Sequence, residues 1–284
     1  MSTPSRIYFH VGLGKVASTY LQYQFFPKLT GIRYIQRTRY KKSPQLIGRS
    51  TTQRVLVSRE FDRQLEREVT WFSGFFREVR PILLLRAHDS WIASQYRRWV
   101  KNGRPHSFDE FFDLEGNTGF WKKKDLLYYP KIKALEKAFA HPPLILFYKD
   151  FCDDPWGFFD QLAAYMGAEY SREAISLQPQ HRSYSEHELK VLREVSPRFY
   201  KTDKSQAHNP ATKVLRRYGR FLTVYSVMAA ARLGVARAHD QAPLIPAARL
   251  SAIHNAYQED WQACVAYAAK TNPRLMNEVP HKKA

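Results

Sequence analysis

The residues most suited to chemistry in this sequence lie at 12–19, where glycine, lysine and hydroxyl side chains come together. The β-branched and aromatic run Ile7–Val11 precedes them and a helical pattern follows, so we expect a strand, a tight loop and a helix N-terminus. In that order, the backbone N–H groups of the loop and the positive end of the helix dipole face one point. A lysine adds a full positive charge there, and serine and threonine add hydroxyl donors. The segment predicts a phosphate-binding loop; the alternative is an ordinary strand–turn–helix with a surface lysine.

The spacing within this loop distinguishes two kinds of phosphate site. In a Walker A loop, G-x-x-x-x-G-K-[ST], the lysine directly precedes the hydroxyl residue, whereas here Lys15 precedes Ser18 and Thr19 by three and four positions. The order instead resembles the 5′-phosphosulfate loop of sulfotransferases that use 3′-phosphoadenosine 5′-phosphosulfate (PAPS), G-x-P-K-[TS]-G-[TS]-T. The family's proline, first hydroxyl and glycine are replaced by Gly14, Val16 and Ala17. The resemblance implies that the donor is bound by Gly14, Lys15, Val16, Ala17, Ser18 and Thr19.

A second group of residues follows the expected strand Ile82–Leu85. Arg86, Ser94 and Tyr96 resemble the family's 3′-phosphate pattern, R-x-P-x-x-x-x-x-S-x-Y, with His88 in place of the proline. A guanidinium suits bidentate binding of phosphate, and a serine hydroxyl supplies a further donor. The resemblance implies that Arg86 and Ser94 bind the 3′-phosphate while Lys15 binds the other end of the same donor. Taken alone, the arginine fits a helix cap and the serine a surface position equally well.

A third segment extends the resemblance. Leu144–Asp150 followed by Asp153-Asp154-Pro155 resembles the family pattern V-L-x-Y-E-D-x-x-x-D-P, with Lys149 in place of the glutamate. The resemblance covers residues 5–200 and the rest only loosely. It implies a P-loop-like fold, PAPS as co-substrate without a metal, and transfer of a sulfuryl group to a hydroxyl or amine with release of 3′,5′-ADP.

The acceptor hydroxyl in such a reaction needs a general base within hydrogen-bond reach. The first candidate is Glu60, the first carboxylate of the chain, in a setting that resembles the S-S-E segment whose glutamate is the base in many bacterial and glycan-modifying members. Its basic surroundings should keep it ionised. The alternative is a purely structural salt bridge from Glu60 to Arg59, Arg63 or Arg86.

Two histidines are further candidates for the base. His88 is expected near the same strand ends. His10 directly precedes the loop and is more typical of a packed histidine that is hydrogen-bonded to the backbone.

The elements that must position these residues alternate along the chain. Apolar runs suited to buried strands are Ile7–Val11, Arg54–Ser58, Ile82–Leu85, Leu144–Phe147 and, more weakly, Ile32–Ile35. Helical patterns cover Asp89–Val100, Trp156–Gly167, Ser185–Val195 with capping-box spacing, Lys213–Ala238 and Ala247–Lys270. A polar, turn-rich stretch at 197–210 predicts a loop. Alternating strands and helices predict a parallel sheet covered on both faces, with ligands at the carboxyl ends of its strands.

We therefore expect an α/β, P-loop-like three-layer fold with a central parallel sheet flanked by helices and a helical C-terminal region. The 284 residues, 44% of them hydrophobic, suffice for one sulfotransferase domain over 1–284, with the α/β core in 1–200 and a helical extension in 211–284. The two cysteines, Cys152 and Cys264, have no metal-ligand spacing and are too few for a disulfide framework. The expected strand begins almost at the N-terminus and leaves no room for a signal peptide, so a cytoplasmic location is expected.

The charge of the chain requires an anionic partner. The net charge is +19, and no aspartate or glutamate precedes Glu60. Such a field concentrates anions and speeds their capture. A phosphorylated nucleotide donor fits it, and so does an acceptor that is a glycan or lipid-linked saccharide bearing negative charge; a phenol, a steroid-like alcohol and a peptide tyrosine remain open.

The segment Lys213–Ala238 is predicted to be a basic amphipathic helix. An amphipathic helix of this kind can lie on an anionic membrane, here the inner face, or can pack into the core with its arginines solvated. Its uncharged part, Phe221–Ala231, is too short to span a bilayer. The expected apolar stripe is Val214, Leu215, Tyr218, Phe221, Leu222, Tyr225 and Met228, with Arg216, Arg217 and Arg220 on the other side.

Two other functions compete with sulfuryl transfer. A P-loop nucleotide or sugar kinase would share the fold, but the position of Lys15 and the lack of a hydrophobic run ending in a clear magnesium-binding aspartate disfavour it. A basic nucleic-acid-binding protein would fit the charge, but no helix-turn-helix, zinc-finger or RRM pattern is present. Specific nucleic-acid binding is therefore not expected.

Overall fold

The structure of the protein is a computed structural model that describes residues 6–178, 184–200, 210–239 and 242–272, with the backbone alone for 210–217. The chain forms two compact units, each made of segments that are not contiguous in sequence. The first comprises Met1–Arg86, Leu127–Gln180 and Gln258–Ala284, and the second Ala87–Leu126 and His181–Tyr257. These units do not follow the expected division near residue 200, because the second takes 87–126 out of the expected α/β core.

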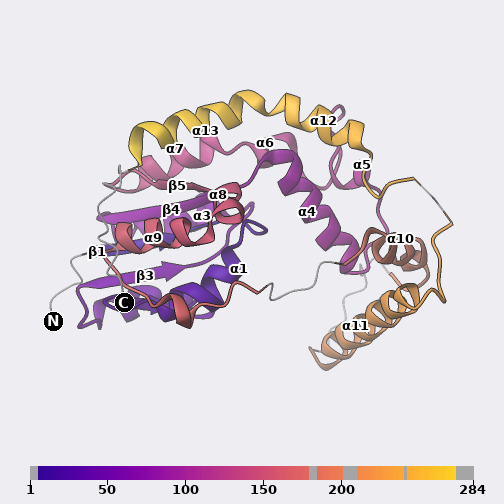
Figure 1. The fold of residues 1–284 in the computed structure, drawn as a ribbon, viewed down its shortest axis with the longest axis horizontal. Helices are drawn as coiled ribbons and strands as arrows, with labels where there is room; N and C mark the ends of the chain where they lie inside the picture. The colour runs from indigo at the N-terminus through magenta and orange to yellow at the C-terminus, as the bar shows by residue number, and fades with distance from the viewer. Residues whose placement is uncertain (1–5, 179–183, 201–209, 240–241, 273–284) are drawn as a thin grey trace. The chain divides into compact units, whose positions relative to one another are not determined.

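The first unit is built on a parallel sheet of five strands (Figure 1). Its strands are β1 (Arg6–His10), β2 (Arg33–Ile35), β3 (Arg54–Ser58), β4 (Val79–Leu85) and β5 (Leu144–Phe147). They lie in the order β2-β3-β1-β4-β5, and every neighbouring pair is parallel. All five strands were predicted from the apolar runs, and the expected fold class is confirmed.

Helices cover both faces of this sheet, as the two central aromatic residues of β1 show. Successive side chains of a strand point to opposite faces. The Phe9 ring packs against Phe72 of α3 (Leu65–Ser73) at 4.3 Å between centroids, whereas Tyr8 packs against Tyr165 of α9 (Pro155–Met166) at 5.7 Å. The sheet is therefore the middle of three layers.

Several shorter helices complete the first unit. They are α1 (Ser18–Tyr20), the π-helix η1 (Leu21–Phe25), the 3-10 helices η2 (Phe26–Lys28), η3 (Arg37–Lys42) and η4 (Arg172–Ala174), α2 (Ser43–Gly48), α7 (Tyr129–Ala138), α8 (Tyr148–Asp153) and α13 (Gln258–Thr271). The Asp154-Pro155 pair has a capping role: the Asp154 side chain accepts a hydrogen bond from the Gly157 N–H at 3.0 Å, with proline at the first helical position of α9. Lys149, which stands where the family has glutamate, forms an ion pair with Asp153 at 2.5 Å.

The described part of the second unit is helical. It contains α4 (His88–Lys101), α5 (Phe108–Phe111), α6 (Lys123–Leu126), α10 (Glu186–Val195), the 3-10 helix η5 (Ser196–Arg198), α11 (Pro210–Arg232) and α12 (Ala247–Ala256). The capping box predicted at the start of α10 is present, because Ser185 accepts from the Glu188 N–H and Glu188 accepts from the Ser185 N–H. The loop expected over 197–210 lies largely outside the described residues.

Two predicted helices differ from expectation, one in its length and one in its continuity. The segment Lys213–Ala238 stops at Arg232, because Gly234 takes a left-handed conformation (φ 74°) that terminates α11. The segment Ala247–Lys270 is not one helix, since the chain leaves helical geometry at Tyr257 and starts α13 at Gln258.

The apolar residues of α11 divide between two environments. Val224 and Met228 are buried against Leu192 of α10, whereas Tyr218 and Leu222 keep 65% and 71% of their surfaces exposed. Among the described members of the expected stripe, Tyr218, Phe221, Leu222 and Tyr225 are at the surface, and Met228 belongs to the packing face. Val214 and Leu215 lie where only the backbone is described.

Candidate functional site

The loop that follows β1 lies at the point where the strand order reverses. The strand after β1 joins the sheet beyond β3, and β4 joins on the opposite side. In an open parallel sheet, ligands bind at the carboxyl ends of the strands at such a switch point. Backbone pairing continues past the ends of β1 and β3, because Arg59 N–H donates to the His10 carbonyl (3.0 Å) and Phe61 N–H to that of Gly12 (3.1 Å). These two bonds hold Glu60 beside the loop.

The loop backbone forms a concave set of N–H donors. Lys15 and Ala17 have left-handed φ angles of 71° and 68°, with a negative φ at Val16 between them. For residues with a side chain, each such conformation costs about 1–2 kcal/mol. Within the described part of the chain, the N–H groups of Val16 and Ala17 form no hydrogen bond. Alternating backbone conformations that present successive N–H groups make an anion-binding nest.

Packing beneath the loop fixes its course. A Cβ on Gly12 would lie 2.6 Å from Ser18 Oγ and 2.7 Å from His10 Nε2, so only glycine fits there. The Ser18 hydroxyl is buried and donates to the Leu13 carbonyl (3.0 Å), which holds the loop closed on itself. In this arrangement Ser18 shapes the loop, and its expected donation to a phosphate stays a prediction.

His10 belongs to this packing and is fully buried. Its Nδ1 is hydrogen-bonded to Ser58 Oγ at 2.7 Å, a side chain rather than the backbone partner that the sequence led us to expect. Burial lowers the pKa of His10 to about 3, so the ring is neutral at physiological pH.

Two residues expected in different roles meet at the surface beside the loop. Lys15 and Thr19 are both exposed, and Thr19 Oγ1 donates a hydrogen bond to Glu60 Oε1 at 3.2 Å. The expected base and an expected donor-binding hydroxyl are therefore neighbours. The Gly14 N–H donates to Asp62 Oδ1 at 2.9 Å, which ties the loop to the segment after β3.

Arg86 lies against the same loop at the end of β4. Its Nη1 donates to the Lys15 carbonyl at 3.2 Å, and its guanidinium lies over the Tyr148 ring at 4.5 Å. Cation–π contact and the carbonyl bond hold the side chain in place. The structure thus brings Lys15 and Arg86, which the sequence places 71 positions apart, into one site.

The remaining expected site residues, His88 and Ser94, belong to the second unit. The His88 ring is buried, with 3% of its surface exposed, and stacks on Tyr257 at 4.8 Å between centroids. Ser94 lies half-buried on α4. Their positions relative to the loop stay predictions.

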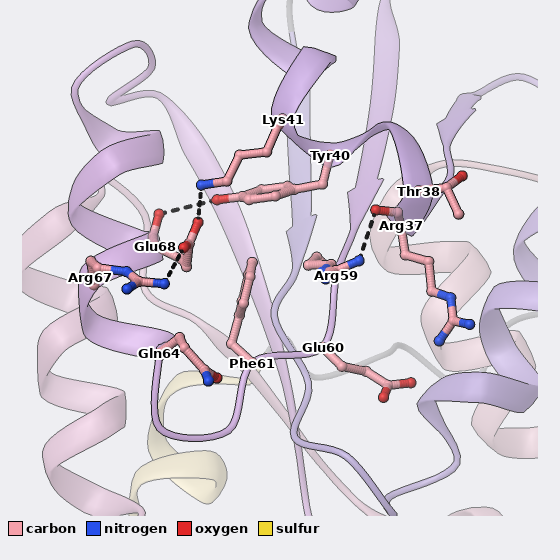
Figure 2. Close-up of a pocket in the computed structure, with 10 residues that line it drawn as sticks. All are labelled: Arg37, Thr38, Tyr40, Lys41, Arg59, Glu60, Phe61, Gln64, Arg67 and Glu68. Carbon is pink, nitrogen blue, oxygen red and sulfur yellow. Dashed lines mark hydrogen bonds and ion pairs between the residues drawn. The ribbon is translucent and has the colours of Figure 1, made fainter. Parts of the chain in front are cut away.

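Glu60 also lines a pocket of about 440 Å³ (Figure 2). Sequence reasoning did not identify it, although the signal was present in the run of cations that precedes the first carboxylate. We call it the basic pocket; it is lined by Arg37, Thr38, Tyr40, Lys41, Arg59, Glu60, Phe61, Gln64, Arg67 and Glu68. These residues come from η3, the segment after β3 and α3.

The described ranges contain no group of three or more histidine, cysteine, aspartate or glutamate side chains placed to hold a metal ion. Among the same residues, no helix combines the length and apolar character needed to cross a bilayer. Both cysteines are free thiols.

Comparison with protein families gives no matching family, and comparison with curated sequences gives no matching protein. Similar solved structures include a sulfotransferase from Alicyclobacillus acidocaldarius, with 14% identity, a TM-score of 0.49, and coverage of 78% of this chain and 97% of that one. Mouse sulfotransferase SULT7A1 complexed with PAP has 11% identity and a TM-score of 0.38, with coverage of 72% and 69%. Retinol dehydratase in complex with androsterone and inactive cofactor PAP has 11% identity and a TM-score of 0.35, with coverage of 98% and 84%. At these values the similarity assigns no activity to this chain.

Proposed function

We propose that this protein is a PAPS-dependent sulfotransferase that transfers a sulfuryl group to a hydroxyl. The observation that carries the proposal is the meeting of three features at the carboxyl ends of the adjacent strands β3, β1 and β4: an N–H nest in the loop that contains Lys15, Arg86 against the same loop, and Glu60 hydrogen-bonded to Thr19. Anion binding and a general base are the two requirements of sulfuryl transfer without a metal. The free N–H groups of Val16 and Ala17 and the exposed charge of Lys15 fit the phosphosulfate end of PAPS.

The reaction needs little covalent help from the protein. The acceptor oxygen attacks sulfur in line, an O–S bond forms, and the bond from sulfur to the 5′-phosphate oxygen breaks, which releases 3′,5′-ADP. Lys15, with Thr19 and the loop N–H groups, stabilises the charge that accumulates on the leaving phosphate oxygen. Glu60 takes the acceptor's proton.

Glu60 is a better base than His88 or His10 on the grounds of access. Glu60 is partly exposed and contacts the loop through Thr19, whereas both histidine rings are buried. Arg86 and Ser94 are assigned to the 3′-phosphate by the resemblance of their sequence pattern. The structure supports the assignment for Arg86 alone, whose guanidinium lies next to the loop that would bind the other end of the same donor.

The acceptor proposed is a glycan or a lipid-linked saccharide. The net charge of +19 supports an acceptor that is itself anionic. The exposed apolar face of α11 supports a peripheral contact with anionic lipid, because Tyr218, Leu222 and Tyr225 are at the surface and no acidic residue lies between Asp203 and Asp240. Co-sedimentation with phosphatidylglycerol vesicles at low salt is expected; absence from the pellet would remove the membrane contact.

The proposed activity is tested by following labelled sulfur from PAPS onto saccharide fractions of a cell extract. Label should appear in an acidic saccharide fraction with wild-type protein and should be absent with Lys15→Ala. Equal labelling by both proteins would refute the assignment of the loop.

A further inference from the structure

We propose that the basic pocket binds an anionic group of the acceptor, a carboxylate or sulfate on a sugar neighbouring the one that is modified. This inference rests on the proposed function and names the residues that select the acceptor. The pocket volume of about 440 Å³ lies within the range of small-ligand sites, roughly 300–1,000 Å³. It has room for a saccharide unit beside Glu60.

At one end of the pocket, a carboxylate pairs with two of the cations that line it. The buried carboxylate of Glu68 pairs with Lys41 Nζ at 2.5 Å and with Arg67 Nη2 at 2.9 Å. Burial raises the pKa of Glu68, but the hydrogen bonds from Lys41 and Arg67 outweigh it and leave the pKa below its ordinary value. Glu68 is therefore ionised at neutral pH and neutralises one of the two positive charges, while both cations stay engaged with it.

The other end carries positive charge without a carboxylate partner. Among the described residues, the guanidinium groups of Arg37 and Arg59 form no ion pair. Arg59 Nη1 donates to the Arg37 carbonyl at 3.1 Å, and the Arg37 guanidinium lies over the Tyr23 ring at 5.3 Å. Both contacts orient the side chains and leave N–H donors of each fork for an oxyanion.

Glu60 links this end of the pocket to the loop. Figure 2 shows the side chains of Arg37 and Glu60 on the side of the pocket away from Glu68. The strand order explains the juxtaposition: Arg37 follows β2, Glu60 follows β3 and Thr19 follows β1, and these strands are neighbours in the sheet. An acceptor whose hydroxyl lies at Glu60 thus has its next substituents at Arg37 and Arg59, which favours a negatively charged neighbour.

The test uses two tetrasaccharides as probes: hyaluronan tetrasaccharide, which carries carboxylates, and the neutral chitotetraose. Binding to the full-length protein is measured calorimetrically with 3′,5′-ADP present and absent. Wild-type protein should bind the acidic probe at least about 10-fold more tightly than the neutral one. Arg37→Gln and Arg59→Gln should each weaken acidic-probe binding by about 10-fold or more while leaving neutral-probe binding unchanged.

Arg39→Gln is the matched control, because Arg39 is exposed on the same element, η3, and does not line the pocket. Its acidic-probe affinity should equal that of wild type. Equal affinity of wild type for both probes, or equal losses in the Arg39 and Arg37 variants, would overturn the proposal. Binding of 3′,5′-ADP alone and binding of the probes without 3′,5′-ADP are measured separately. If the donor assignment is wrong, 3′,5′-ADP does not bind, while the protein still prefers the acidic probe.

Discussion

Two cationic regions flank Glu60, and they are built in different ways. The β1 loop (residues 12–19) is one continuous segment whose shape depends on strained backbone and buried packing. The basic pocket is assembled from side chains of η3, the segment after β3 and α3, at the surface. The first presents backbone N–H groups with little freedom to move, and the second presents long guanidinium side chains.

This difference predicts which part of the site accepts only one anion geometry and which part accepts several. A preorganised backbone nest favours one anion geometry at little reorganisation cost. Arginine side chains on a surface adapt to several anions, at an entropic cost for each side chain that is fixed. We therefore expect loss of the loop charge to abolish reaction and changes in the pocket to alter mainly the acceptor affinity.

The largest effect is expected at the loop. Lys15→Ala should lower turnover by at least about 10³-fold, because the leaving phosphate loses its principal positive charge. The thermal unfolding midpoint should change little, since Lys15 is exposed. Steady-state sulfuryl transfer from PAPS measures the effect, with Lys28→Ala, also an exposed lysine of the first unit, as control. Equal losses of turnover in both variants would mean that Lys15 acts only through the overall positive charge of the protein and has no specific role in the loop.

The junction of the two regions is tested at Glu60. Glu60→Gln should lower turnover by about 10²–10⁴-fold through loss of the base, while 3′,5′-ADP affinity stays within about twofold of wild type. Glutamine can still accept the hydrogen bond from Thr19. Calorimetric titration of 3′,5′-ADP alongside the rate assay separates the two roles. If nucleotide binding collapses together with turnover, Glu60 holds the loop rather than performing the chemistry.

The same contrast explains what the sequence predicted. Regular apolar runs gave all five strands, because a fully covered parallel strand reads as a continuous apolar segment. Lys15, Thr19 and Arg86 were found because their motifs are local. The pocket residues Arg37 and Arg59 were not, because only the sheet order brings η3 next to the end of β3.

Three further features of the structure could not be predicted either, because they depend on the surrounding structure rather than on a local sequence pattern. The left-handed conformation of Ala17 arises from the loop as a whole, and alanine gives no sign of it in sequence. Likewise, the break at Tyr257 between α12 and α13 has no glycine or proline to mark it. The two compact units depend on contacts between distant segments, which periodicity does not encode.

A pH titration tests the buried packing beneath the loop. The folded-state pKa of His10, about 3, lies below its ordinary value of 6.5. Its contribution to stability is therefore complete above about pH 6.5 and is lost as pH falls toward 3, at up to about 1.4 kcal/mol per pH unit. Chemical denaturation at pH 7, 6 and 5 should show this slope, and His10→Gln should reduce it. His187→Gln, at an exposed position, should leave it unchanged; a wild-type slope in the His10 variant would place its origin elsewhere.

The smallest effect concerns backbone strain. Ala17→Gly should raise the free energy of unfolding by about 0.5–1 kcal/mol, because relief of the left-handed conformation exceeds the entropic cost of glycine. Ala252→Gly, at an exposed position inside α12, should instead lower it by about 1 kcal/mol. Denaturant titration of both variants measures the contrast, and a loss of stability in both would show that Ala17 is not strained.

The central claim is that the β1 loop and Arg86 bind a nucleotide phosphorylated at both the 3′ and 5′ positions. A thermal-shift comparison of 3′,5′-ADP, 5′-ADP and Mg-ATP, with the first two in EDTA, tests it most directly. We expect 3′,5′-ADP to raise the unfolding temperature of wild type without metal, 5′-ADP to raise it less, and Lys15→Ala to lose most of the shift. Stabilisation by Mg-ATP with no response to 3′,5′-ADP would contradict the account and indicate a kinase.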